Sequence, residues 1–443
     1  MSEFLSKIRS SNINNKYYII NFLFSLFPAS FIAGNMIINL NILILIIVSF
    51  FFFKKDLFSI KYFLLDKLVF LFFIFVLFTG FVNDIIFIIT DAYPSGYDTI
   101  LKSLFYLKYL LLYLIIRFLF EQNYIKIKYF FISCGLCSIF VCFDIFYQFI
   151  LGVDIFGYQT IEGSRKLSGP FGDELIAGGY IQRFSIFTFF ILPFFYINLS
   201  KKYSIFLIPI LFLIFITGIV FSGNRMPFIL FIFSITLILI FQKGTRKYFL
   251  PFLVISVLIF SILYNFNPKI KNNFSSFYFN INKMTSILIN KDFQNEHTPQ
   301  YLREFSTFYD TWLLNKFIGG GIKNFRYYCH VRPNVDKDAE FICNMHPHNY
   351  YLEILTEIGL LGLLIILSVF IICLYISIFK KYFSPGNRSD NHHIVPFMFL
   401  FLTEIFPIKS TGSFFTTGNA TYIFLIMTIT IALARKYNTI EKI

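Results

Sequence analysis

The sequence predicts an all-α fold, a polytopic membrane bundle of about twelve transmembrane helices with one large external loop that contains short helices. Of the 443 residues, 57% are hydrophobic and only 14% are charged, whereas soluble domains average about 45–50% apolar and about 25% charged residues. The apolar residues fall in runs of roughly 20, the length of helix that crosses about 30 Å of hydrocarbon. A soluble or disordered chain is therefore excluded.

The predicted spans follow the apolar runs along the chain. The first six are expected near Tyr17–Gly34, Met36–Phe53, Leu68–Ile89, Ile100–Phe120, Tyr129–Leu151 and Ala177–Leu199. The other six are expected near Tyr203–Phe221, Met226–Phe241, Tyr248–Tyr264, Tyr350–Phe379, Ile394–Ile408 and Gly418–Ala434. The chain thus divides into residues 1–264 with nine helices, a loop over residues 265–349, and residues 350–443 with three helices.

Cationic residues predict the orientation of these spans, because Lys and Arg in short loops are retained on the cytoplasmic side. One alternate set of connections and termini carries 20 Lys and Arg residues, whereas the opposite short loops carry only Arg165, Lys166, Arg225 and Lys409. Both termini are therefore expected in the cytoplasm and residues 265–349 outside. The net charge of +14 follows mostly from this topology, and we expect no nucleic-acid partner.

The external loop of residues 265–349 is the connection large enough to hold a site. It is polar, and a helix that contains Trp312 is expected near Gln300–Lys316. A second external segment, Gly152–Ile176, is shorter and rich in glycine, and we expect it to be an ordered loop.

Two cysteines of the external loop, Cys329 and Cys343, leave two alternatives open. In an oxidising periplasm they could form a disulfide. With His330, His346 and His348 their thiolates could instead bind zinc, although the spacing matches no standard zinc pattern.

The densest polar cluster stands at the start of the apolar run that begins at Tyr350. It contains His346, His348, Asn349, Glu353 and Glu357. A neutral imidazole suits the removal of a proton from a sugar hydroxyl near neutral pH. The two carboxylates are four residues apart, hence on one helix face, and could orient the histidine or a substrate hydroxyl. The alternative is an interfacial loop whose His and Asn side chains only cap the helix.

Positive charge on or near the outer face comes from four arginines, Arg165, Arg183, Arg225 and Arg326. Arg225 ends the tight turn Ser222-Gly-Asn-Arg225 between two spans. A guanidinium at membrane depth is costly without an anionic partner or a wet cavity, and its fork matches phosphate oxygens. A membrane-embedded diphosphate is therefore the predicted ligand. The alternative for any one arginine is an internal ion pair with Asp173, Glu174 or Glu357.

Two weaker patterns in the external loop bear on phosphate and metal binding. The triple glycine Gly319–Gly321 resembles a phosphate-cradling loop only loosely, because the G-x-x-x-x-G-K-[ST] pattern is missing. Asp336 and Asp338 form a carboxylate pair that could hold a divalent metal, although such pairs are frequent by chance. The prediction therefore includes no metal and no cofactor.

Four motifs, in this order along the chain, resemble the O-antigen ligase and O-antigen polymerase superfamily. They are Arg165–Tyr180, Ser222–Arg225, GGGIKNF from Gly319 to Phe325, and HPHNYYLEILTEIGLLGLL from His346 to Leu364. The similarity runs from about Arg165 to Gly362, and the layout of about twelve spans agrees with it.

The resemblance implies an inverting glycosyltransferase of the C type that needs neither metal nor nucleotide. Such enzymes act at the periplasmic face of the bacterial inner membrane, where they move a glycan from undecaprenyl diphosphate to an acceptor during assembly of O-antigen or other surface polysaccharides. His348 matches the general base, with His346 as the alternative, and Arg225 and Arg165 match the diphosphate-binding arginines. The implied partners are the lipid-linked donor, a glycan acceptor such as a lipid-linked repeat or lipid A-core, and membrane lipid.

The competing hypothesis is a transporter, for example a flippase of lipid-linked oligosaccharides. Twelve spans suit it, and Lys108 and Asp144, which should face the bundle interior, favour it. Against it, the polar residues cluster at the outer face, whereas a transporter places its site near the midplane. Polymerases, ligases and protein-glycosylating enzymes share the motifs, so the sequence leaves the acceptor open.

Overall fold

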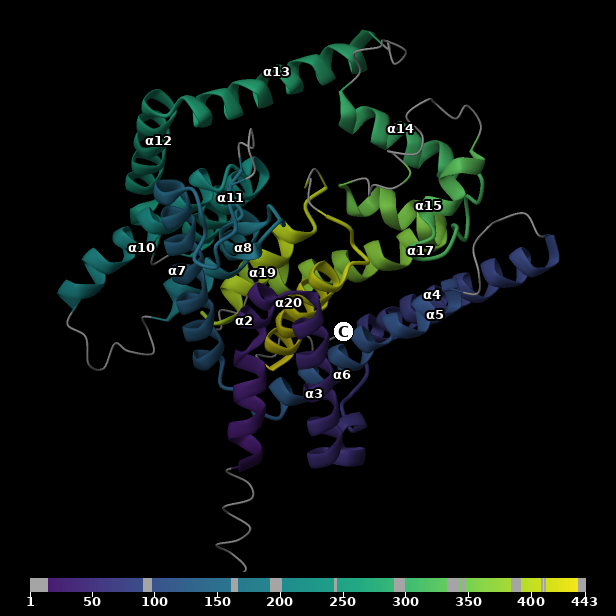
Figure 1. Cartoon of the computed structure of the whole chain (residues 1–443). Helices are drawn as coiled ribbons and strands as arrows, with labels where there is room; N and C mark the ends of the chain where they lie inside the picture. Colours follow the sequence, from purple (N-terminus) through teal and green to yellow (C-terminus); the bar gives the residue numbers. More distant parts are fainter. Residues whose placement is uncertain are drawn as a thin grey trace, which may run out of the picture.

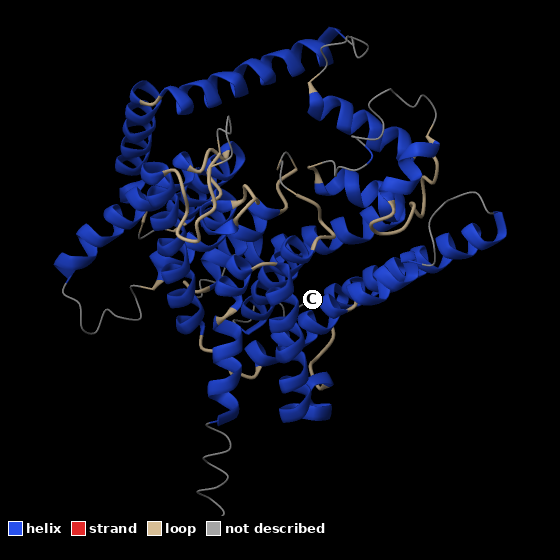
Figure 2. Cartoon of the chain, in the orientation of Figure 1, coloured by secondary structure: helices blue, strands red, loops and turns tan. Residues whose placement is uncertain are grey.

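The computed structural model describes residues 15–90, 98–160, 166–191, 201–242, 245–290, 299–332, 343, 348–383, 392–407, 409 and 412–436. Figure 1 shows these residues as a bundle of helices with one long helix, α13 (Pro268–Asn290), running across one end. The described part of the chain is helical, with one isolated bridge between Val153 and Gln159 and no other extended pairing (Figure 2). The all-α prediction is confirmed for these residues.

Among the described residues, seven helices are long and apolar enough to cross a membrane. They are α3 (Asn35–Phe53) with η1 (Lys54–Phe58), α4 (Leu64–Thr90), α5 (Asp98–Tyr106) joined to α6 (Lys108–Glu121), α7 (Ile127–Leu151), α12 (Phe249–Phe266), α17 (Tyr350–Leu374) extended by η6 (Tyr375–Phe379) and α18 (Lys380–Phe383), and α20 (Thr417–Lys436). Shorter apolar stretches are residues Leu207–Phe221 of α10 (Lys201–Phe221), α11 (Arg225–Phe241) and α19 (Ile394–Glu404). Several apolar helices of this length indicate a multi-pass membrane protein.

An eighth span results if the bent pair at the beginning of the described chain is counted as one. Asn15–Ser25 and α2 (Phe27–Ala33) meet at an angle of 42°. Pro28 lies in the first turn of α2. Proline lacks the backbone N–H that would continue the hydrogen-bond ladder of the preceding helix, which accounts for the bend.

The sixth predicted span, Ala177–Leu199, is not one continuous α-helix. α8 covers only Ala177–Phe184, and the 3-10 helix η3 follows over Ser185–Phe190; residues 192–200 lie outside the described part of the chain. α8 is surrounded by α7, α10 and α11, and six of its eight residues are buried. It is therefore an internal helix, and the number of twelve spans stays a prediction.

The centre of the bundle is formed by α20. Its residues from Ala420 to Ala434 are buried, and it packs against α3, α6 and α19. A helix that is apolar on all sides belongs in such an interior position. Its Phe424 contacts the rings of Phe73, Tyr106 and Tyr109, so α20 joins the first and last thirds of the chain.

The segment of residues 265–349 carries a small core of its own. Besides α13 it contains α14 (Gln300–Trp312), which confirms the helix expected there, and α15 (Phe325–Tyr328). Cys329 and Cys343 form a disulfide with their Cα atoms 5.5 Å apart, so their thiolates are not available to zinc. Together with Phe308 and Phe325 the disulfide packs against Leu352 of α17. The connections hold the short 3-10 helices η2 (Gly169–Phe171), η4 (Arg246–Tyr248) and η5 (Cys329–Val331).

The long helix α17 is broken at Gly359, whose backbone has φ 69° and ψ −176°. In an unbroken helix the N–H groups of Leu360 and Leu361 would donate to the carbonyl groups of Thr356 and Glu357. The break frees all four groups in an apolar span, where each unsatisfied group would cost several kcal/mol. Other partners must therefore replace the lost bonds.

The loop of residues 316–321 supplies those partners. Gly320 N and Gly321 N donate to Thr356 O (3.0 Å) and Glu357 O (2.7 Å), and Leu360 N and Leu361 N donate to Lys316 O (2.9 Å) and Phe317 O (3.2 Å). Only glycine permits this approach of two backbones. A Cβ on Gly359 would lie 2.3 Å from Phe317 O, and a Cβ on Gly319 would lie 2.5 Å from the Glu357 carbonyl carbon. The triple glycine is thus a backbone clamp on the broken helix.

We predict that Gly359→Ala and Gly319→Ala each lower the free energy of unfolding by about 2 kcal/mol or more. Each places a Cβ against backbone at a positive φ, which costs about 1–2 kcal/mol before the clash is counted. Thermal unfolding of the detergent-purified protein measures the effect. Gly179→Ala is the control, since its nearest contact would be Pro227 Cγ at 3.9 Å. Equal unfolding temperatures for all three variants would contradict the clamp.

Candidate active site

His348 and Asn349 lie at the beginning of α17. Asn349 is the N-cap residue, and its Oδ1 accepts hydrogen bonds from Tyr351 N at 3.0 Å and Leu352 N at 3.2 Å. His348 has φ 49°, in the left-handed region that residues other than glycine rarely adopt. Its ring centre lies 6.2 Å from that of Tyr301 in an edge arrangement. The structure therefore gives Asn349 the capping role of the alternative interpretation and fixes the backbone of His348 at the helix terminus.

A second contact ties this terminus to the segment that follows α19. Asn349 Nδ2 donates to Pro407 O at 2.9 Å, and the hydroxyl of Tyr351 donates to Ile405 O. His346, the alternative base, lies outside the described residues.

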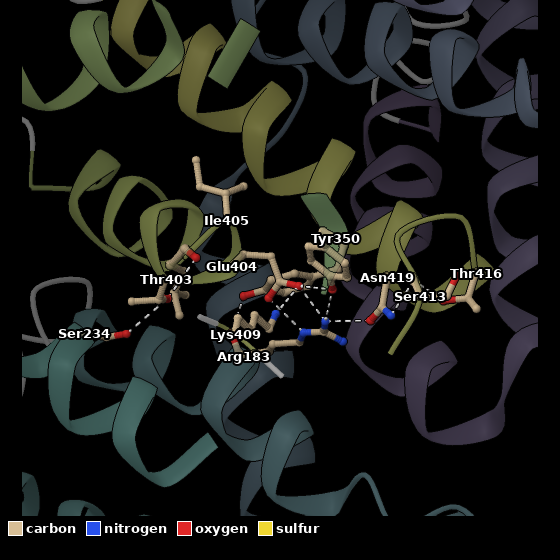
Figure 3. A network of polar contacts seen from close by, with 12 residues as sticks. Arg183, Ser234, Tyr350, Thr403, Glu404, Ile405, Lys409, Ser413, Thr416 and Asn419 are labelled. Atoms are coloured by element: carbon tan, nitrogen blue, oxygen red, sulfur yellow. Dashed lines mark hydrogen bonds and ion pairs between the residues drawn. The ribbon is translucent and has the colours of Figure 1, made fainter. Parts of the chain in front are cut away.

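Tyr350 enters a buried network centred on Glu404 (Figure 3). The Glu404 carboxylate accepts hydrogen bonds from the Tyr350 hydroxyl at 2.9 Å, from Arg183 Nη2 at 2.6 Å and from Arg183 Nε at 3.1 Å. Lys409 forms an ion pair with the same carboxylate. Arg183 Nη2 also donates to Asn419 Oδ1 at 2.7 Å. One buried carboxylate thus balances two cations and holds three segments of the chain together.

Arg183, predicted to bind substrate, is instead engaged by protein groups. Its partner is Glu404, not one of the three acids that the sequence analysis names for an internal ion pair. A signal for Glu404 exists in the sequence, because it is a carboxylate at the end of an apolar run, five residues before a lysine, and such a carboxylate needs a cationic partner when it is buried. Lys409 follows α19, and burial lowers its pKa to about 7 although Glu404 raises it. Because arginine keeps its charge at this pH, Arg183 is the permanent counter-ion of Glu404.

Arg225 begins α11 and lies under α13. Its Nε donates to Asn273 Oδ1 at 2.5 Å, and its guanidinium lies over the ring of Phe277 at 5.4 Å. Asn273 is buried and also donates from Nδ2 to Gly223 O at 3.0 Å. The same amide therefore fixes both the turn and the arginine that ends it.

The Ser222–Arg225 turn is joined to the loop that precedes α8. Gly178 N donates to Asn224 Oδ1 at 3.0 Å, and Leu167 N donates to Ser222 O at 3.2 Å. Arg165 lies outside the described residues. Leu167, two positions further along the chain, is thus in direct contact with the turn that carries Arg225.

The short helix α8 connects the arginine turn with the histidine terminus. Gly178 in its first turn contacts Asn224, and Arg183 near its end contacts Tyr350, two residues after His348. Five residues of α-helix rise about 7.5 Å. The Arg225 turn and the beginning of α17 are therefore connected through α8, one contact being made at each end of this short helix.

The two carboxylates of α17 have different surroundings. Glu353 accepts hydrogen bonds from the Ser413 hydroxyl and from Phe414 N, so it anchors the loop before α20. Glu357 Oε2 is buried and makes no hydrogen bond to a described residue.

Arg326, the fourth predicted arginine, lies apart from the other site residues on α15, where it is exposed. Its charge interacts with that of Lys102 on α5. Within the described part of the chain, no three His, Cys, Asp or Glu side chains come together as a metal site. Asp336 and Asp338 lie outside that part.

Comparison with known proteins agrees with this arrangement. A family model described as O-antigen ligase matches residues 210–367, which include the Ser222–Arg225 turn, the glycine clamp, His348 and Gly359. Over these residues the chain is similar to the O-antigen ligase family, which supports membership of the O-antigen ligase and polymerase superfamily. No curated protein matches the sequence.

Membership of the O-antigen ligase and polymerase superfamily supports glycan transfer of the ligase or polymerase type in surface polysaccharide assembly, with a lipid-linked glycan and an acceptor as substrates. The matched region does not include Arg183 or Glu404, yet both contact Tyr350 of its histidine motif. Parts outside the match therefore complete the site of this superfamily member.

We predict that Glu404→Gln lowers the free energy of unfolding by about 3–5 kcal/mol, because Arg183 and Lys409 would be left buried without their counter-ion. Glu174→Gln is the matched control, since Glu174 is an exposed acid of the same loop system. Thermal unfolding in detergent compares the two variants. An equal loss in both, or no loss in either, would contradict the buried ion-pair network.

Proposed function

We propose that the protein transfers a glycan from undecaprenyl diphosphate to a sugar hydroxyl of an acceptor at the periplasmic face of the bacterial inner membrane, as a polymerase or ligase of O-antigen or other surface polysaccharides. The observation that carries this proposal is that α8 contacts both the Arg225 turn and the His348 terminus of α17. Glycosyl transfer from a diphosphate needs fixed positive charge on the leaving group and a base beside the acceptor.

The proposed reaction is a single inverting displacement. The acceptor hydroxyl oxygen attacks the anomeric carbon, the bond from that carbon to the phosphate oxygen breaks, and the lipid diphosphate leaves with the electron pair. His348 takes the proton of the attacking hydroxyl, with His346 as the alternative base. Arg225 and Arg165 bind the diphosphate, because guanidinium forks donate paired hydrogen bonds to phosphate oxygens. Fixed cations stabilise the leaving charge without a metal or nucleotide.

Arg183 has a positioning role in this proposal. Its guanidinium is occupied by Glu404, Asn419 and Tyr350 and therefore orients the first turn of α17. Asn349 contributes in the same way as the cap of that helix. The left-handed backbone of His348 supports its role as the base, since strained backbone concentrates at functional sites.

The two residues that favoured a transporter have structural partners. Lys108 Nζ donates to Asn39 Oδ1 at 2.6 Å, and Asp144 Oδ1 accepts from Ile155 N at 2.8 Å. These hydrogen bonds explain the presence of Lys108 and of one Asp144 oxygen in the bundle, so neither requires a transport path. We therefore favour the transferase.

We predict that His348→Ala lowers kcat by about 10²–10⁴-fold, the usual contribution of a general base, and that Arg225→Ala lowers it by about 10²–10³-fold, the usual loss of one preorganised donor. Transfer is measured with a radiolabelled lipid-linked donor and the purified protein. His330→Ala and Arg246→Ala are the controls, because both residues lie outside the proposed site.

Near-normal turnover in both site variants would contradict the mechanism. Movement of lipid-linked glycan across proteoliposomes without an acceptor-dependent product would instead identify a transporter.

A further inference from the structure

A second group of cations lies where α5 meets the glycine clamp. It consists of Lys102 on α5, Lys323 directly after the clamp and Arg326 on α15. Lys323 and Arg326 are exposed and Lys102 is half-buried. Within the described residues none of the three lies in direct ion-pair contact with a carboxylate, unlike the cations around Glu404, although Asp98 and Glu357 interact with their charges over a longer distance.

The close packing of α5 on the clamp brings these side chains together. A Cβ on Gly321 would lie 2.1 Å from Thr99 Cγ2, so the loop backbone rests directly on α5. Lys102 Nζ lies 5.7 Å from the ring centre of Tyr327, the neighbour of Arg326. The charge of Lys102 interacts with those of Lys323 and Arg326. Lys102 is thus within electrostatic reach of both other cations and of the carboxylates of Asp98 and Glu357, and an anionic ligand would add to the charge that these two acids supply.

Buried polar groups border the same junction. Glu357 Oε2, the Tyr106 hydroxyl and the Thr99 hydroxyl are each buried and make no hydrogen bond to a described residue. The Glu357 carboxylate interacts with Lys323 and Lys102 and thus faces the cation group. Asp98 also lies near Lys102. A ligand with phosphate and sugar hydroxyl groups would use both the cations and these polar atoms.

The junction is separate from the Arg225 turn. Tyr350, on the first turn of α17, contacts Arg183, whereas Glu357 interacts with Lys323 and Lys102. Seven residues of helix bring both side chains to the same face about 10 Å apart. Figure 1 shows α8 and α11 on one side of the bundle and α5 and α15 on the other. The first two turns of α17 therefore link two cationic places, with His348 at their beginning.

We propose that Lys102, Lys323 and Arg326 form a binding site for the phosphate-bearing headgroup of the acceptor lipid. The inference rests on the proposed function, because the Arg225 turn is assigned there to the donor diphosphate and the reaction needs a second substrate. An acceptor anchored in the membrane presents its phosphate at the outer leaflet, the depth predicted for the beginning of α5. The shared chemistry is an anionic lipid headgroup, from a polyprenyl diphosphate or from a phosphorylated lipid A.

The kinetic test compares two triple variants that remove equal charge. Lys102→Gln, Lys323→Gln and Arg326→Gln are combined in one, and Lys269→Gln, Lys271→Gln and Lys283→Gln on α13 in the control. The site variant should raise the acceptor KM about tenfold or more, since charge-assisted hydrogen bonds to phosphate are lost, with donor KM and kcat within about twofold. A parallel rise of the donor KM, no change in either KM, or the same rise in the control would overturn the proposal.

A binding test without turnover separates this site from the proposed function. Undecaprenyl diphosphate, bis-phosphorylated lipid A and phosphatidylglycerol are each titrated into Arg225→Ala alone, which removes the donor site, and into Arg225→Ala combined with either triple variant. Selective loss of undecaprenyl diphosphate binding in the site variant supports the site and a polymerase, and selective loss of lipid A binding supports it and a ligase.

If the site variant loses phosphatidylglycerol binding to the same extent as the binding of the other two lipids, the three cations only contact bulk lipid and the proposed site is wrong. If none of the three lipids binds, the proposed site is also wrong, and a protein acceptor remains. If the wild type transfers no glycan while the binding loss persists, the transferase proposal fails and the anionic lipid site stands.

Discussion

A membrane helix that interrupts its own hydrogen-bond ladder must find other partners for the freed backbone groups, because hydrocarbon offers none. In this protein the partners of the break at Gly359 are backbone groups of residues 316–321. These hydrogen bonds hold the loop of residues 316–321 against α17 at Gly359. The disulfide core of Phe308 and Phe325 then packs against the same helix two turns earlier. The orientation of His348 depends on both contacts.

Buried charged side chains need partners for the same reason as the freed backbone groups. Glu404 would be costly to bury alone, and so would Arg183; together with Lys409, Tyr350 and Asn419 they satisfy one another. Such a network is sensitive to the removal of any one member but gives α17 a single position. A catalytic base that must meet an anomeric carbon within hydrogen-bond reach requires that fixed position more than it requires added stability.

Features that depend on local sequence patterns could be predicted from the sequence. Features that depend on contacts between residues far apart in the chain could not. Apolar run lengths predicted the helices of the bundle, and α14 was found where expected. The sequence did not show that the sixth predicted span begins with α8, a short helix buried among its neighbours, because that burial depends on contacts with other helices. The Arg183 and Glu404 pair joins positions 221 residues apart, which no local pattern indicates. The triple glycine resembled a phosphate loop because close backbone approach and phosphate binding both require glycine.

Some cations of this protein are bonded to a buried carboxylate and others are exposed. In the proposed function this difference decides which cations hold α17 in position and which bind an anionic donor or acceptor. A guanidinium already bonded to a carboxylate, as Arg183 is to Glu404, has little left to offer a phosphate and serves geometry. Exposed cations that lie in no direct ion pair among the described residues, such as Lys323 and Arg326, are proposed to donate to a ligand instead. Because both kinds border the same first turns of α17, a shift of that helix would alter both places together. The glycine clamp is what prevents such a shift, so the backbone exchange at Gly359 is as much part of the proposed chemistry as the histidine.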